Sequence, residues 1–108
     1  LNDYDLRALG VLTGAFPQVK LGAAWWFNDT VNGIKRQLET AAEYSALGTQ
    51  YGMLTDSRSF SSYVRFDFYR RILSSFIGEK TEKGEYDENA AIALVKKLAY
   101  ENIKAALL

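Results

Sequence analysis

The sequence contains neither cysteine nor histidine. Without cysteine, a disulfide framework, a zinc ribbon and thiol catalysis are all excluded within these 108 residues, and the composition suits a cytoplasmic protein. Without histidine, the commonest general base and the commonest metal ligand are both missing. Any catalysis must therefore use carboxylate, arginine, lysine, tyrosine or hydroxyl groups, or groups from outside the chain.

The chain also lacks a net charge, because its 13 basic and 13 acidic side chains cancel. A neutral chain offers no electrostatic footprint for nucleic acid or for an anionic membrane surface. Residues 63–71 combine arginines with aromatic rings, a mixture that can indicate nucleic-acid binding. Their helical spacing buries the rings, however, and Asp67 lies beside the arginines. We therefore expect no nucleic-acid partner, and the short apolar runs predict no membrane span.

Apolar spacing predicts the order helix, strand, helix, strand, helix, helix. Strands and helices that alternate in this way are typical of an α/β fold with a parallel sheet. Gly78 is expected to end the third helix, residues 79–86 to form a charged connector, and Asp87 to cap the last helix. The predicted helices are 2–15, 30–46, 61–78 and 87–106, and the predicted strands are 19–27 and 51–55.

Two strands alone make a poor sheet, because both of its edges stay open. The pattern therefore predicts that part of the fold is missing, and a start at Leu1 without an initiator Met agrees with this. Each predicted helix also carries an apolar face that is expected to be buried. The residues expected to face the core are Leu6, Leu9, Val11 and Leu12 in the first helix; Ile34, Leu38, Ala41 and Ala42 in the second; Val64, Phe68, Tyr69, Ile72, Leu73, Phe76 and Ile77 in the third; and Ile92, Val95, Leu98, Ala99 and Ile103 in the last.

A polar cluster, Thr55 to Arg58, follows the second predicted strand. In parallel α/β folds, functional groups gather where strands end. If the backbone stays extended, Asp56 and Arg58 point to the same side. The carboxylate can then accept a proton or bind a metal, while the guanidinium holds a substrate carboxylate by two parallel hydrogen bonds. A simple Asp–Arg pair with a helix cap is the alternative interpretation.

Two tryptophans end the first predicted strand. Neighbouring side chains on a strand point to opposite faces, so one of Trp25 and Trp26 is expected to face inward. An inward indole can form one wall of a sugar site, although both rings can equally be part of the core. Asn28, Asp29 and Thr30, which follow, are expected to cap the next helix, and this is the simplest interpretation of Asn28 and Asp29.

These segments together resemble a known family. The run GMLTDSRSF from Gly52 to Phe60, and the segment 63–73 after it, are similar to the C-terminal signature of uronate isomerases, also called glucuronate isomerases. The resemblance covers about Val19 to Leu108. It includes segments 25–29 and 36–38 with Gly33, and more weakly 84–86 and 100–104.

The resemblance implies a helix-rich α/β fold, the C-terminal fragment of a (β/α)8 TIM barrel of the amidohydrolase superfamily. The predicted strands would be barrel strands seven and eight, and residues 1–108 would form a single segment. Members of the family interconvert glucuronate with fructuronate and galacturonate with tagaturonate, moving a proton between C2 and C1 through an enediol. The implied partners are the uronate substrate and the remainder of the barrel, with homo-oligomers also open.

The resemblance also implies roles for single residues. Asp56 matches a position that ligates a metal or transfers a proton, Arg58 matches one that contacts substrate, and Trp25 or Trp26 lines the same pocket. The implied cofactor is a divalent metal such as zinc, with its remaining ligands outside this chain, because the family's His-x-His pair is absent. Phe66 stands where family members usually carry histidine. The isolated chain is therefore expected to be inactive.

Two other interpretations stay open at the level of sequence. The chain could fold alone as a structural or interaction domain, with its strand edges covered by self-association. It could also belong to a different amidohydrolase-type barrel that catalyses hydrolysis, since the aspartate alone does not distinguish the two reactions.

Overall fold

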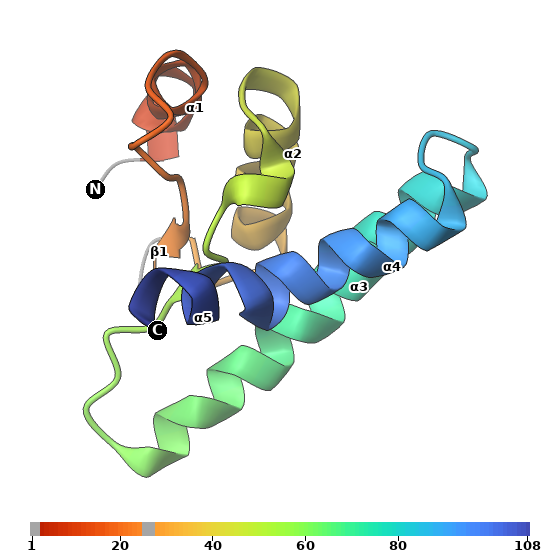
Figure 1. Ribbon diagram of the computed structural model, residues 1–108. Coiled ribbons are helices and arrows are strands. Elements are labelled where there is room, and N and C mark those ends of the chain that lie inside the picture. Colours follow the sequence, from red (N-terminus) through yellow and green to blue (C-terminus); the bar gives the residue numbers. More distant parts are fainter. Residues whose placement is uncertain (1–2, 25–27) are drawn as a thin grey trace.

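The computed structural model describes residues 3–24 and 28–108, and its elements follow the predicted order (Figure 1). The strands are much shorter than predicted, and the last helix contains one wide π turn. The elements are η1 (Asp3–Asp5), α1 (Leu6–Ala15), β1 (Ala23–Ala24), α2 (Val31–Tyr44), η2 (Leu47–Thr49), β2 (Met53–Leu54), η3 (Phe60–Tyr63), α3 (Val64–Glu82), α4 (Glu88–Lys96), the π turn η4 (Lys97–Glu101) and α5 (Asn102–Leu107).

The two strands pair in parallel, as predicted, with Ala23 opposite Met53 and Ala24 opposite Leu54. The described pairing covers two residues on each strand. Gly52 interrupts β2 on its N-terminal side, because its φ of 81° lies outside the extended region. Residues 25–27 of the first predicted strand lie outside the described residues.

Helix boundaries depend on caps. The cap predicted at residues 28–30 is confirmed at Thr30, whose hydroxyl accepts from the Gly33 N–H at 3.0 Å. The predicted end of the third helix at Gly78 was wrong. The α3 helix continues through Gly78 to Glu82, because one interior glycine costs only about 1 kcal/mol. The predicted cap at Asp87 is confirmed, since its carboxylate accepts from the Ala90 N–H.

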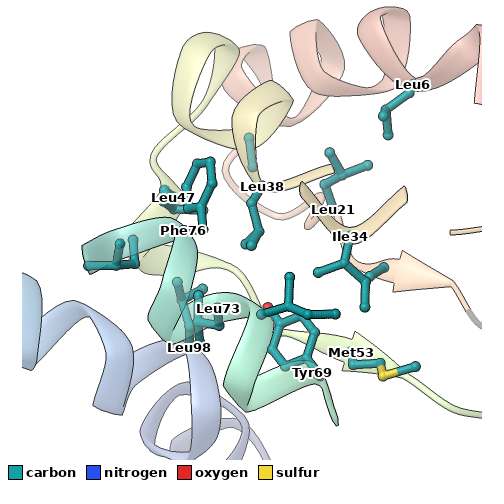
Figure 2. Packing of buried hydrophobic residues seen from close by; sticks show 14 of the residues in the cluster. Leu6, Leu21, Ile34, Leu38, Leu47, Met53, Tyr69, Leu73, Phe76 and Leu98 are labelled. Carbon is teal, nitrogen blue, oxygen red and sulfur yellow. The ribbon is translucent and has the colours of Figure 1, made fainter. Parts of the chain in front are cut away.

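The core lies between the sheet, α2, α3 and the π turn (Figure 2). Figure 2 shows Ile34 and Leu38 of α2 facing Tyr69 and Leu73 of α3, with Leu98 packed beneath. The buried faces predicted for α2 and for the middle of α3 are confirmed. Other residues predicted to be buried are 39–69% exposed: Leu9, Val11, Leu12, Val64, Phe68 and Ile92.

The exposed leucines of α1 have a clear physical reason. The α1 helix packs on α2 through Gly10, Gly14 and Thr13 rather than through its larger residues. A side chain at Gly14 would overlap the main-chain oxygen of Tyr44, so only glycine permits this approach. Arg7 adds a hydrogen bond between α1 and α2, because its Nε donates to the Tyr44 hydroxyl at 2.6 Å. The helices lie side by side in Figure 1.

The C-terminal helix is tied to the segment that leads into β2. The amide nitrogen of Asn102 donates to the main-chain oxygens of Gly48 and Gln50, at 2.8 and 2.7 Å. Gln50 is itself buried, and its side-chain oxygen accepts from the Leu21 N–H just before β1. These bonds connect both strand starts to one another and to the end of the chain.

The α1–α2 contact predicts unequal effects of two glycine substitutions. Gly14→Ala is expected to lower the free energy of unfolding by about 1–3 kcal/mol, because the new methyl group meets rigid backbone. Gly10→Ala is the matched control: its methyl group meets the Thr40 side chain at 2.6 Å, which can move, and the gain in helix propensity offsets the cost. Urea unfolding of the complete polypeptide that contains these residues measures both. Equal midpoints for the two variants would contradict this packing.

Candidate active site

The polar cluster lies at the carboxyl end of β2, as predicted, but its backbone is not extended. Asp56 has a φ of 45°, in the left-handed region, where aspartate is tolerated better than most residues. The premise that Asp56 and Arg58 share one side of an extended strand is therefore wrong. Among the described residues, β2 ends at Leu54, and Asp56 lies in the turn that follows it.

Thr55 is the buried anchor of this turn, with 7% of its surface exposed. Its hydroxyl accepts from the Ser57 hydroxyl at 2.9 Å. Its main-chain oxygen accepts from a guanidinium nitrogen of Arg65, at 3.5 Å. The strand end is thus held both by its own loop and by the first turn of α3.

Arg65 also contacts the strand end, although the sequence analysis gave it no role of its own. It belonged to a run read as an amphipathic helix and as part of the family signature, and the fold brings its half-buried guanidinium to the residue before Asp56. Its position in the first turn after the strand-end loop was the available signal. In βα units the first turn of the helix lies above the end of the strand.

Asp56 and Arg58 are both exposed to solvent. Several large apolar side chains of the same chain are exposed as well. Leu12, Phe16 and Leu54 are each about half exposed. The two side chains therefore lie on an unfinished surface rather than on the outside of a closed domain. Trp25 and Trp26, the other predicted site residues, lie outside the described residues.

A cavity of about 420 Å³ lies beside β2, which pairs with β1 alone in the described part of the chain. It is lined by Met53 and Leu54 of the strand and by Thr55 and Asp56 of the turn that follows. The remaining walls come from α3 and the C-terminal helix and are mostly apolar.

Tyr69 forms part of this wall and is 3% exposed. Its hydroxyl finds no hydrogen-bond partner within the described part of the chain. Burial raises the pKa of this hydroxyl well above its ordinary value of 10.0, because the phenolate would be poorly solvated. At neutral pH Tyr69 is therefore a neutral donor and not a base.

The described residues do not fit a metal site by themselves. Among residues 3–24 and 28–108, no three potential ligands from His, Cys, Asp and Glu lie close enough to hold an ion. Asp56 is a single carboxylate, whereas a catalytic zinc takes three protein ligands. The same residues contain no helix long and apolar enough to cross a bilayer. The cytoplasmic location stays a prediction.

Comparison with known proteins gives consistent matches. A sequence model of the glucuronate isomerase family matches residues 1–107, which extends the resemblance over α1. The uronate isomerase of Staphylococcus haemolyticus is 48% identical over 91 residues, covering 82% of this chain and 20% of that protein. That of Lactococcus lactis is 42% identical over 110 residues, covering 95% of this chain and 23% of that protein.

A solved structure also matches. The crystal structure of uronate isomerase from Thermotoga maritima superposes with a TM-score of 0.93 and 38% identity. The match covers 100% of this chain and 24% of that one. The chain therefore spans about a quarter of the length of the relatives it matches, and within that quarter it shares their fold.

Burial of Tyr69 predicts a loss of stability in alkali. Above pH 10 the unfolded chain releases the tyrosine proton while the folded chain keeps it, so rising pH favours unfolding. The free energy of unfolding should fall by about 1.4 kcal/mol per pH unit more steeply in the wild type than in Tyr69→Phe. Urea titrations from roughly pH 9 to pH 11 measure this difference.

The matched control is Tyr100→Phe, which removes a hydroxyl from a side chain that is 58% exposed. It is expected to keep the pH dependence of the wild type. Identical pH dependence in Tyr69→Phe and the wild type would show that the Tyr69 hydroxyl is not buried in the folded protein.

Proposed function

The chain belongs to the glucuronate isomerase family, and on this premise we propose that it supplies part of the active site of a uronate isomerase. The reaction would interconvert an aldose and a ketose uronate, glucuronate with fructuronate or galacturonate with tagaturonate. The observation that carries the proposal is Asp56, placed at the carboxyl end of a parallel strand within a segment that matches this family throughout.

The incomplete sheet supports a place within a (β/α)8 barrel. We propose that β1 and β2 are its strands seven and eight and that residues 1–108 form one segment of it. The free edge of β2, with its adjoining apolar cavity, is suited to a further strand. Exposed Leu9 and Leu12 on α1, and Phe16 just after it, would be covered by the missing helices. The remainder of the barrel is thus the first partner of this chain.

In the proposed reaction Asp56 transfers the proton between C2 and C1. An exposed carboxylate on a turn beyond the strand end can reach a substrate held above the barrel. Arg58, two residues on, would hold the substrate carboxylate by two parallel hydrogen bonds. One of Trp25 and Trp26 would form an apolar wall for the sugar ring.

A metal, if the complete enzyme uses one, would take Asp56 as a ligand and complete its coordination from outside this chain, because no three potential ligands gather among residues 3–24 and 28–108. No step of the proposed proton transfer depends on it. A self-contained interaction domain is the weaker proposal, because a domain that folds alone would not leave the apolar face of α1 uncovered.

The role of Asp56 is tested by removing its charge. In the complete polypeptide, Asp56→Asn is expected to lower kcat for glucuronate by about 10²- to 10⁴-fold, the usual contribution of a general acid–base group. The matched control is Asp67→Asn, because Asp67 is an exposed carboxylate on α3 that pairs with exposed Arg71 at 2.8 Å. A steady-state isomerisation assay gives both values. Near-normal turnover by Asp56→Asn, in folded protein, would contradict the assignment.

The isolated 108-residue chain is expected to show no isomerase activity, because it holds only one of the required acid–base groups. Activity should return when the remaining segment of the polypeptide is supplied as a separate chain and the two associate. The assay measures ketose formation from glucuronate by each chain alone and by their mixture. Turnover at the normal rate by the 108 residues alone would refute the proposal.

A further inference from the structure

The backbone adopts an uncommon conformation at the residue to which the proposed function gives the proton transfer. Among the residues that the structure describes, Asp56 is the only one other than glycine with a positive φ, 45°. Most side chains are strained in this left-handed region, and aspartate tolerates it better than most. Such a conformation persists only where the surrounding structure holds it. The contacts around Asp56 therefore decide where its carboxylate lies.

One contact bridges the two neighbours of Asp56. The Ser57 hydroxyl donates to the Thr55 hydroxyl at 2.9 Å, so the side chains before and after Asp56 are joined. Thr55 is 7% exposed, whereas Asp56 is exposed to solvent. One end of the bridge is thus fixed in the core, and the carboxylate that it spans is exposed above it.

A second contact holds the peptide unit between Thr55 and Asp56. The oxygen of this unit accepts from a guanidinium nitrogen of Arg65 at 3.5 Å. Rotation of the unit changes ψ of Thr55 and φ of Asp56 together, so a hydrogen bond to its oxygen opposes relaxation to a negative φ. Arg65 is half-buried in the first turn of α3. The conformation of Asp56 is therefore held from its own loop and from the following helix.

We propose that Thr55, Ser57 and Arg65 are positioning residues for the isomerisation. They hold Asp56 in its left-handed conformation and so place its carboxylate for proton transfer. This inference rests on the proposed function, in which Asp56 is the acid–base group. Such a group works only within hydrogen-bond reach of the proton, and misplacement by about 1 Å costs about 10²-fold in rate. The three residues act through the backbone of Asp56 without touching the substrate.

Matched substitutions in the complete polypeptide test the hydroxyl bridge. Thr55→Val and Ser57→Ala each break it with little change of shape, whereas Thr55→Ser and Ser57→Thr keep both hydroxyls. The two bridge-breaking variants are expected to lower kcat for glucuronate by about tenfold, and the other two to stay within about threefold of wild type. KM is expected to change by less than about twofold, because exposed Arg58 still reaches the substrate carboxylate.

Combined variants separate positioning from general damage. Because Thr55→Val and Ser57→Ala remove the same bridge, their double variant is expected to lose about tenfold in kcat, and not the roughly hundredfold of two independent effects. Arg65→Met removes the other contact and Arg65→Lys keeps a donor, so only the former is expected to lower kcat, by about tenfold. A crystal structure of Ser57→Ala/Arg65→Met, which lacks both contacts, is expected to show Asp56 with a negative φ.

The control is Ser61→Ala, because the exposed Ser61 hydroxyl pairs with that of Ser59 at 2.8 Å in the same connection from β2 to α3. It is expected to keep the wild-type kcat, and circular dichroism checks that each variant is folded. If Thr55→Val does not fold, Ser57→Ala and Ser57→Thr give the same comparison.

Three results would overturn the inference: wild-type kcat in the bridge-breaking variants, a loss of roughly hundredfold in their double variant, or a φ at Asp56 that stays positive once both contacts are removed. Any of them, with Asp56→Asn inactive, leaves the proposed function standing. Near-normal turnover by Asp56→Asn contradicts the proposed function itself, and this inference with it.

Discussion

The candidate site depends on the parallel pairing of β1 with β2, which among the described residues involves two residues on each strand. Such a short ladder is not stable alone. It persists because α2 and α3 cover it and because side chains fix the strand starts. Gln50 ties the chain before β1 to the chain before β2, and Asn102 holds that second segment against the C-terminal helix. The position of Asp56 follows from this anchoring.

The strand end shows how the fold places a functional group without a regular backbone. Thr55 is held by Ser57 and Arg65, and the chain then turns through the left-handed conformation at Asp56. The carboxylate of Asp56 is exposed on this turn, and buried Thr55 anchors the turn to the core. A reactive group presented in this way can meet a substrate while the strand stays packed.

Much of the uncovered apolar surface lies beside the short sheet and on α1. In the proposed barrel, further strands would pair with the free edge of β2, and further helices would cover the exposed leucines of α1.

The sequence alone determined the order of elements, the parallel sheet, the family, and the polar cluster after the second strand. These follow from local information: apolar period, caps such as Asp87, and a run of residues specific to one family. Tertiary structure decided the rest. The strand lengths depend on partners, the leucines of α1 are exposed because Gly14 makes the contact instead, and Arg65 reaches Thr55 only once α3 packs on the sheet. The left-handed φ of Asp56 could not be predicted from the sequence either. Aspartate tolerates this conformation but does not require it, so the path of the chain between β2 and α3 decides whether it is adopted.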